Sequence, residues 1–325
     1  MLRSSPATLI AALLAMQLGV VACEPAATPP EEEAPTVPTQ SDGYDAPIGS
    51  GPVFLADQFQ LSQPGSGLDI NGDGETDGII NEAWLPAIPI INQRFQASIN
   101  SSRILIAMEL TGLEQPYAGD DSSVTFKLYN CEDEDQDPSN NYCRDPGCAR
   151  VLPKDHYIED GQSRYRAQPA PIVAERYAGY IDEKFGIAME GEEDLEVSGL
   201  HVEMTVPADL WELRDGVVCG VSSAADLHRV TLPLCEYQPG FCELSGVPDD
   251  LTIAEYLVLL HADPDIDMDA DGIERFVLDE GARVAGCYDG DGAEIVGPDC
   301  LEDPRMADGY SICFDMHGIP ATLVQ

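Results

Sequence analysis

Apolar residues alternate with polar ones along much of this chain. A period of two residues is typical of a strand with one buried face. Two stretches follow the alternation most clearly: GLHVEMTV, from Gly199 to Val206, and SICFDMH, from Ser311 to His317. β-branched and aromatic residues bounded by Gly, Pro or Asp predict further strands in the same way. These strands are expected within residues 51–61, 103–112, 123–130 and 212–223.

A second period, near 3.6 residues, predicts one longer helix. Its apolar face recurs at steps of four, three, four and four, at Trp84, Ile88, Ile91, Phe95 and Ile99. Proline is tolerated in the first helical turn, so the helix is expected to begin around Pro89, after a short turn.

Two shorter helices are predicted by their N-cap residues, Ser222 or Ser223 for one and Thr252 for the other. Strands dominate and do not alternate regularly with helices. The expected fold is therefore mostly β and β-sandwich-like, or α+β, with two or three short helices and disulfide-pinned loops.

The N-terminal segment is a targeting signal rather than part of the fold. Residues 1–22 hold an apolar core with Arg3 as the single charge, which is too short for a mature transmembrane helix and typical of a signal peptide. Val20-Val21-Ala22-Cys23 resembles the lipobox of bacterial lipoproteins. That resemblance implies cleavage before Cys23 and lipidation of its thiol. An ordinary signal peptide cut after Ala22 is the alternative.

The residues after Cys23 predict a tether that leads to a folded body. Residues 23–50 are rich in Pro, Glu and Thr and nearly lack large apolar side chains, so they cannot bury a core. We expect the body to span residues 51–325. Its length allows one domain or two, and residues 131–155 are the natural place for an internal boundary.

The charge balance excludes some partners and favours cations. The chain has 59 Asp and Glu against 16 Lys and Arg, a formal net charge of -43. Such a surface repels nucleic acid and anionic lipid heads. The acids are spread along the whole body, so most of the excess is expected to serve solubility. A metal site needs them clustered.

The stretch LDINGDGETDG clusters acidic residues in the pattern of a calcium loop. Counted from Asp69, side-chain oxygens fall at positions one, three, five and nine, and Gly74 takes position six, where the backbone turns sharply. The predicted oxygen donors are Asp69, Asn71, Asp73 and Asp77, with the main-chain carbonyl of Glu75. Position twelve is Ile80 instead of the bidentate Glu of an EF-hand, so another acid must complete the sphere.

A second copy of the pattern lies in DMDADGIE. Its predicted donors are Asp267, Asp269 and Asp271, with the main-chain carbonyl of Ile273. Gly272 again takes position six, and Leu278 replaces Glu at position twelve. Solvated Asp/Gly turns are the alternative for both copies, but the repetition favours Ca²⁺.

The ten cysteines predict disulfides, because a secretory signal implies an oxidising compartment. With Cys23 lipidated, nine remain and one thiol is left over. Short spacing suggests two bridges, Cys235–Cys242 and Cys287–Cys300. Cys131 is expected to pair with Cys143 or Cys148, and Cys219 with Cys313 across two sheets. No spacing typical of zinc ligands occurs.

Together these motifs resemble known groups of proteins. The loops resemble the Asp-x-Asp-x-Asp-Gly loops of EF-hand, dockerin and thrombospondin type 3 families. With the Cys23 lipobox, the tether and the terminal DGYSICFDMHGIPATL, they resemble uncharacterised envelope lipoproteins of myxobacteria and their relatives. The resemblance implies a calcium-binding lipoprotein held in the cell envelope at the outer membrane, on its periplasmic face or at the cell surface, without an established activity.

The motif search gives no catalytic constellation. The chain has no P-loop, no Gly-x-Ser-x-Gly elbow and no His-Glu-x-x-His. We therefore expect a structural or ligand-binding role, with the membrane, a glycan or another envelope protein as partner. The alternative is a secreted glycosidase or esterase on a calcium-stabilised scaffold. Trp84 is expected in the core, whereas Trp211 is the better candidate for an exposed sugar platform, although partial burial is the expected state.

Overall fold

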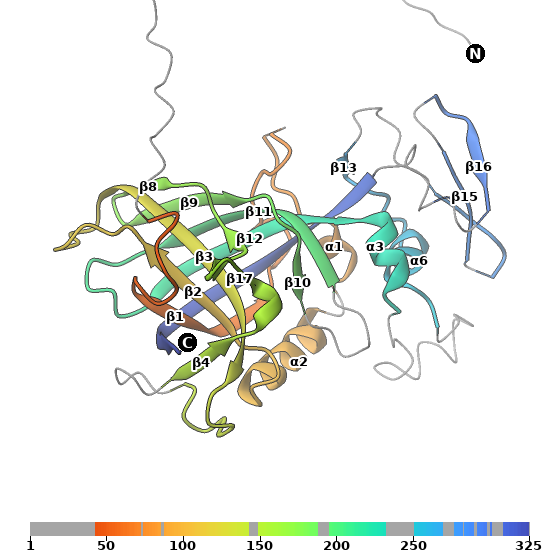
Figure 1. The fold of residues 1–325 in the computed structure, drawn as a ribbon. Helices are drawn as coiled ribbons and strands as arrows, with labels where there is room; N and C mark the ends of the chain where they lie inside the picture. Colours follow the sequence, from red (N-terminus) through yellow and green to blue (C-terminus); the bar gives the residue numbers. More distant parts are fainter. Residues whose placement is uncertain are drawn as a thin grey trace, which may run out of the picture. The chain divides into compact units, whose positions relative to one another are not determined.

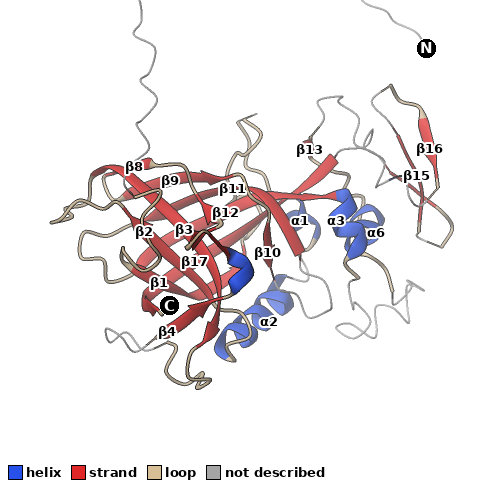
Figure 2. Cartoon of the chain, in the orientation of Figure 1, coloured by secondary structure: helices blue, strands red, loops and turns tan. Residues whose placement is uncertain are grey.

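A computed structural model of the chain describes residues 43–72, 74–85, 88–142, 149–187, 195–231, 250–268, 276–281, 283–288, 291–297, 300 and 308–324. The signal segment, Cys23 and the tether up to residue 42 lie outside this range. The described residues are mostly β, as the sequence predicts (Figures 1 and 2).

Among the described residues, twelve strands form one large sheet. They are β1 (Val53–Leu61), β2 (Ile106–Thr111), β3 (Asp121–Asp133), β4 (Arg150–Pro153), β7 (Tyr165–Arg166), β8 (Ala170–Val173), β9 (Arg176–Ile181), β10 (Phe185–Ile187), β11 (Leu195–Thr205), β12 (Leu213–Ser223), β13 (Ile266–Asp267) and β17 (Asp308–Leu323). Two smaller sheets hold β14 (Phe276–Leu278), β15 (Val284–Tyr288) and β16 (Glu294–Val296), and β5 (Ile158–Glu159) and β6 (Gln162–Ser163).

Eight of these strands form a closed ring in which every neighbouring pair is antiparallel. The pairing runs β17–β1–β2–β3–β8–β9–β11–β12 and returns to β17. One face of each strand looks into the ring, which accounts for the alternation in the sequence. In β11, Leu200, Val202 and Met204 are buried, whereas His201 and Glu203 stay partly exposed.

The short strand β4 closes a second, smaller ring beside the first. It pairs with β3 on one side and, in parallel, with β17 on the other. Strands β1, β2, β3 and β17 belong to both rings and bury both faces. Along β1, Phe54 packs in the larger core, whereas its neighbours Val53 and Leu55 pack in the smaller one. Burial on both faces explains why β2 reads as a nearly continuous apolar run.

Helices cover part of this sheet. They are α1 (Ile79–Ala83), α2 (Ile88–Asn100), α3 (Ala224–Arg229), α6 (Ile253–Leu259) and the 3₁₀ helix η1 (Asp155–Tyr157). Helix α2 lies against β1. Phe95 meets the stacked rings of Phe59 and Phe314 edge-on, and the centroids of the stacked rings are 4.6 Å apart. Asn92 fixes the helix to the strand end, since its side chain bonds the backbone N–H and C=O of Leu61.

The two short helices begin with the caps that the sequence predicts. The Ser223 hydroxyl accepts the backbone N–H of Asp226 at the start of α3. At the start of α6, Thr252 and Glu255 form a reciprocal capping box. Within the described residues, the helices are too short or too polar to serve as transmembrane spans.

Two described disulfides hold distant parts of the chain together. Cys287 of β15 is bonded to Cys300 with a Cα–Cα distance of 5.6 Å, which confirms that predicted pair. Cys219 and Cys313 are also bonded, and their Cα atoms are 4.1 Å apart. They lie directly opposite each other on β12 and β17, so this bridge joins neighbouring strands of one sheet rather than two sheets.

Other cysteines differ from the prediction or lie outside the described residues. Cys131 is a free thiol buried in the smaller core, because β3 continues through it and turns its side chain inward. The predicted pairing of Cys131 with Cys143 or Cys148 is therefore wrong. The predicted pair Cys235 and Cys242 lies outside the described residues.

The segment 43–50, which the sequence assigns to the tether, lies on the body. The carbonyl of Gly43 accepts the Thr111 hydroxyl at 2.5 Å, and the carbonyl of Ala46 accepts the Lys127 ammonium at 2.6 Å. Lys127 is fully buried under this segment. The folded body therefore includes at least these residues.

The body is continuous across the boundary considered near residues 131–155. Strands β3 and β4 flank this region and pair with each other, and residues 38–325 form one compact unit.

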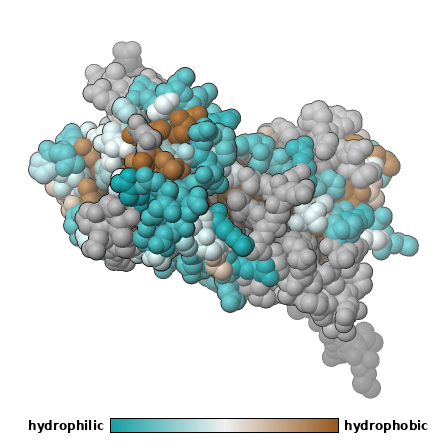
Figure 3. Space-filling view, turned by 60° about the horizontal axis from the view of Figure 1, so that its bottom comes forward, coloured by the Kyte–Doolittle hydropathy of each residue, from teal (hydrophilic) through white to brown (hydrophobic). Residues whose placement is uncertain are grey.

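On the face in Figure 3, most described side chains are hydrophilic and the hydrophobic ones lie in small patches. The hydrophilic character of this face agrees with the excess of Asp and Glu over Lys and Arg in the sequence.

Candidate metal centre

The first acidic loop wraps its backbone around the carboxylate of Asp69. One oxygen accepts the N–H of Gly72 at 2.6 Å, and the other accepts the N–H of Gly74 at 3.0 Å. Both glycines have positive φ, 82° and 91°, a region that L side chains rarely adopt. The sharp turn predicted at Gly74 is confirmed.

The far end of the loop returns to the same turn. One oxygen of Asp77 accepts the N–H of Ile70 at 2.6 Å and that of Asn71 at 3.2 Å. The N–H of Asp77 donates to the carbonyl of Leu68. Each carboxylate oxygen has two lone pairs, so Asp69 and Asp77 keep acceptor capacity while they shape the loop.

This loop is seated on the Cys219–Cys313 disulfide. The N–H of Leu68 donates to Cys219 Sγ at 3.2 Å, and Cys313 Sγ lies 3.4 Å from the carbonyl oxygen of Asp77. Gly67 permits this close approach, because a Cβ there would lie 2.7 Å from Cys313 Sγ. The bridge thus holds both the start and the end of the loop.

The second acidic loop begins on the neighbouring edge of β17. Asp267 pairs with Asp308 in the short ladder between β13 and β17. Just before it, the carboxylate of Asp265 accepts the backbone N–H of Ser311 at 2.8 Å and also the Ser311 hydroxyl. The other predicted donors of this loop lie outside the described residues: Asp269, Asp271 and Ile273.

Ser311 joins the two loops. Its hydroxyl oxygen accepts the N–H groups of Gly78 and Ile79, at 2.6 and 2.9 Å, where the first loop leads into α1. Its proton goes to Asp265, two residues before the first predicted donor of the second loop. Sequence reasoning misses both residues. Ser311 is one small polar residue inside an apolar strand, and in the sequence Asp265 is only part of an acid run that blurs the register.

The charge of the first loop reaches Asp265, which precedes the second loop. Burial raises the pKa of Asp265, and the negative charge of Asp77 raises it further, whereas hydrogen bonds from Ser311 oppose the shift. The pKa of Tyr310 is raised by burial and then by the negative charges of Asp263, Asp265 and Asp308.

The donors of the first loop fit calcium by their chemistry. They are oxygens on short side chains of a glycine-rich turn, and calcium takes six to eight oxygen ligands from flexible loops. The nearby sulfurs are bonded to each other and so cannot act as thiolate ligands. Within the described part of the chain, no three His, Cys, Asp or Glu side chains gather closely enough to hold a metal. The predicted sphere also draws on Asn71, on the Glu75 carbonyl and on Asp73, which lies outside the described residues.

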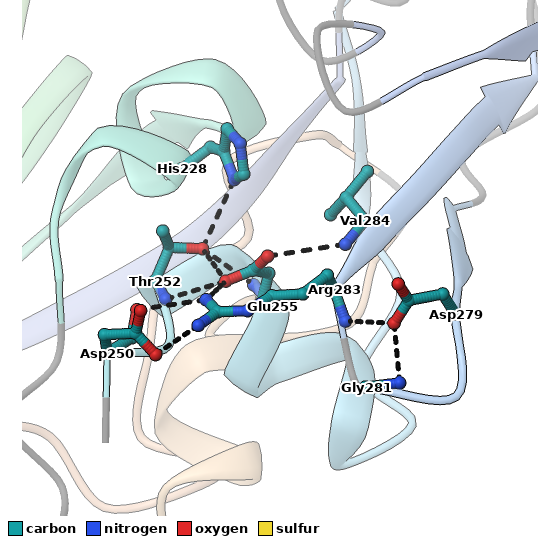
Figure 4. Close-up of polar contacts among 8 residues, drawn as sticks. All are labelled: His228, Asp250, Thr252, Glu255, Asp279, Gly281, Arg283 and Val284. Atoms are coloured by element: carbon teal, nitrogen blue, oxygen red, sulfur yellow. Dashed lines mark hydrogen bonds and ion pairs between the residues drawn. The ribbon is translucent and has the colours of Figure 1, made fainter. Parts of the chain in front are cut away.

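A second polar centre links α6 to β15 (Figure 4). Glu255 is almost completely buried, and one of its oxygens lies 2.9 Å from the guanidinium of Arg283, which also pairs with Asp250. The same oxygen accepts the N–H of Thr252 at 3.0 Å, and the other accepts the N–H of Val284. This centre docks the three-stranded sheet on the capped helix.

The Thr252 hydroxyl of the second centre is engaged in the helix cap. The Thr252 oxygen accepts the Glu255 N–H and lies 3.1 Å from the Glu255 carboxylate and 3.3 Å from Nδ1 of His228. A hydroxyl has one proton, and the carboxylate is its closer acceptor. This geometry suits the role of Thr252 as the cap of α6.

His317 lies where the pairing of β17 with β1 and with β12 has an irregular register. Nδ1 of His317 lies 2.5 Å from Asp57, and Nε2 lies 3.5 Å from Glu212. Carboxylates thus face both ring nitrogens. Trp211, next to Glu212, is 45% exposed instead of partly buried, whereas Trp84 lies in the core as predicted.

Comparisons with known proteins identify no relative. No family model, no curated protein and no solved structure matches the chain. Functional inference therefore rests on the residues of this chain.

Proposed function

We propose that this chain is a calcium-binding lipoprotein of the cell envelope with a structural or ligand-binding role. The observation that carries the proposal is the first loop. There Asp69 and Asp77 approach one glycine turn from both ends and keep acceptor capacity. Lipidation at Cys23 and the tether after it would hold the body at the outer membrane, on its periplasmic face or at the cell surface.

Calcium would stabilise the body by neutralising crowded carboxylates. A ligand that binds only the folded state adds about 4 kcal/mol when its concentration exceeds the dissociation constant a thousandfold. Extracellular calcium modules bind weakly, with dissociation constants of about 0.1 to 1 mM. The expected stabilisation at 1 mM calcium is thus about 0.4–1.4 kcal/mol for each site.

Thermal melting with calcium and with chelator, at matched ionic strength, tests the metal. We expect a higher melting temperature with calcium than with chelator. Asp73→Ala and Asp271→Ala should each remove the part of this increase that comes from the loop that holds the substituted residue. Asp209→Ala is the matched control, because this exposed carboxylate also accepts a backbone N–H but lies outside both loops. Equal melting temperatures, or an equal effect of magnesium, would contradict calcium binding.

Metabolic labelling with a fatty acid tests the anchor. Cys23→Ser should abolish incorporation of label and release the protein from membranes without detergent, because serine lacks the thiol that the lipobox reaction modifies. The disulfide variant Cys287→Ser is the control, since it also removes a thiol but leaves the lipobox intact. Continued labelling of Cys23→Ser would refute the lipoprotein assignment.

A further inference from the structure

An exposed tryptophan lies beside a smaller apolar residue that is packed inside. Leu210 packs against the large core, whereas its neighbour Trp211 is 45% exposed. The backbone of Leu210 has a positive φ of 52°, a region that L side chains rarely adopt. Burial of the larger indole would remove more apolar surface from water than burial of leucine. The side chain that folding alone would bury first is therefore the one that stays at the surface.

The β11–β12 connection, which carries Trp211, is fixed by two neighbouring connections of the ring. The N–H of Val206 donates to the carbonyl of Glu175 at 2.7 Å, and the N–H of Ala208 donates to the carboxylate of Glu175 at 2.9 Å. The carbonyl of Val206 accepts the hydroxyl of the buried Tyr117 at 2.8 Å. A connection that is already ordered loses little conformational entropy when a partner binds.

The charges around the indole are mostly negative. Asp209 is exposed and accepts the N–H of Trp211 at 3.2 Å, and Glu212 follows Trp211 in the chain. Residues 203–215 hold four acids and one basic residue, Arg214, which already forms an ion pair with Glu212. The indole is thus an apolar platform in an anionic surrounding.

This combination suits a cation with an apolar stem. The face of an indole attracts the charged groups of Arg and Lys, and the aliphatic stems of both side chains pack on apolar surface. The net charge of -43 adds a long-range attraction for a basic partner and a repulsion for anionic ones. A neutral glycan would use the ring but gain nothing from the charge.

We propose that Trp211 and the acids beside it bind an Arg- or Lys-rich segment of a partner protein. This inference rests on the ligand-binding role in the proposed function and names the chemistry of the ligand. It requires neither calcium nor the lipid anchor.

Fluorescence anisotropy of a labelled hexa-arginine peptide, titrated with the full chain in detergent at about 150 mM salt, measures the binding. Trp211→Ala should weaken it at least about five-fold, because a tryptophan at the centre of an interface typically contributes a factor of this size or more. A labelled hexa-citrulline peptide, which has the same length without the charge, should bind more weakly than hexa-arginine. The melting temperature of the variant checks that it is folded.

Tyr180→Ala is the matched control. Tyr180 is also an exposed aromatic residue, at 41%, and its hydroxyl lies 3.2 Å from the carboxylate of Asp182. Both variants keep the net charge of the chain, so a general attraction to the acidic surface acts on them equally. We expect Tyr180→Ala to bind hexa-arginine as tightly as the wild type.

A pair of charge variants tests the acids in the same way. Asp209→Asn removes one negative charge, and its amide oxygen can still accept the N–H of Trp211. Asp182→Asn removes the same charge beside the control tyrosine. We expect Asp209→Asn to weaken hexa-arginine binding more than Asp182→Asn does.

Tryptophan fluorescence gives a second readout. Trp84 is buried and Trp211 is exposed, and the chain has two tryptophans, so acrylamide quenches mainly Trp211. Saturating hexa-arginine should protect Trp211 from acrylamide in the wild type. Unchanged quenching at saturation would show that the peptide binds elsewhere and would overturn the inference.

The remaining outcomes separate this inference from its competitors. Equal affinities of Trp211→Ala and Tyr180→Ala would overturn it in favour of a general attraction to the acidic surface. Binding of chitohexaose that depends on Trp211, with hexa-arginine binding that does not, would overturn it in favour of a glycan. The melting temperature with calcium is measured on the same preparations. A chain that responds to calcium but does not distinguish Trp211 from Tyr180 would therefore refute this inference and leave the proposed metal binding intact.

Discussion

At the scale of single residues, burial controls the ionisation of several side chains. Tyrosines shielded from water, such as Tyr177, have raised pKa values because phenolate is poorly solvated there. The pKa of Tyr117 is raised to about 12, first by burial and then by the negative charges of Glu175, Asp120 and Asp121. An acidic protein thus resists the ionisation of its own tyrosines.

This shift predicts how stability depends on alkaline pH. The folded-state pKa of Tyr117 exceeds the unfolded value of about 10, so its stabilising contribution is complete below pH 10 and is lost toward pH 12. Tyr117→Phe removes the hydrogen bond to the Val206 carbonyl, which should cost about 1 kcal/mol at pH 8. Above pH 10 the gap to the wild type should narrow by up to about 1.4 kcal/mol per pH unit.

Urea unfolding of both proteins between pH 6 and 11.5 measures this gap. The interval from pH 6 to 9 serves as the internal control, since the gap should be constant there. A gap that stays constant through pH 11.5 would show that Tyr117 ionises normally in the folded protein.

At the scale of elements, local patterns predict only what neighbouring residues decide. The face of α2 and the position of Pro89 in its first turn follow from spacing alone, as does the Thr252 cap of α6. For α1 the sequence predicts only a turn, because the cap of this helix comes from Ser311, far away in the sequence. The pairing of β1 with β17, which helps to close the ring, is equally invisible to periodicity.

The same distinction between local and long-range features applies to the candidate site. The oxygen spacing from Asp69 to Asp77 and its turn at Gly74 are local, and the sequence contains them. The seat of the loop on the disulfide and its contact with the second loop depend on long-range pairing of β12 with β17. Prediction from sequence therefore reaches the loops but not their arrangement.

The docking of the small sheet on α6 predicts a strong effect of one arginine. Arg283→Met leaves the buried Glu255 carboxylate without its cation, which should lower the free energy of unfolding by about 3 kcal/mol. Arg164→Met is the control, because the Arg164–Glu183 pair is exposed and should contribute less than about 1 kcal/mol.

Urea unfolding at neutral pH compares these two variants with the wild type, and limited proteolysis reports whether the sheet loosens. Equal stability of Arg283→Met and Arg164→Met would show that Glu255 is satisfied by the capping box alone.

At the scale of the whole molecule, residues 43–50 cover a buried charge of the body. Lys127 and Glu109 are cross-strand neighbours on β3 and β2, and both are completely buried. Burial lowers the pKa of Lys127, and the charge of Glu109 opposes this shift. The segment before β1 supplies hydrogen bonds to both buried charges. The carbonyl of Ala46 accepts a hydrogen bond from the Lys127 ammonium, and the N–H of Gly51 donates to the Glu109 carboxylate.

This arrangement predicts that the segment stabilises the body although it resembles a tether. A chain that begins at Gly51 loses the carbonyl of Ala46 and leaves the Lys127 ammonium without this acceptor. Leaving a buried charged group unsatisfied costs about 3 kcal/mol, so this chain should unfold at lower urea concentration than one that begins at Gly43. A chain that begins at Cys23 should match the one from Gly43, if residues 23–42 act as a tether.

Combining the truncation with Lys127→Met tests the cause. If the unsatisfied ammonium carries the cost, shortening the chain from Gly43 to Gly51 should destabilise Lys127→Met by about 1–3 kcal/mol less than the wild type, as a double-mutant cycle would measure. If the wild-type chains that begin at Gly43 and at Gly51 are equally stable, residues 43–50 do not stabilise the body. An equal cost in both backgrounds would assign the stabilisation to the other contacts of the segment, such as that between Gly43 and Thr111.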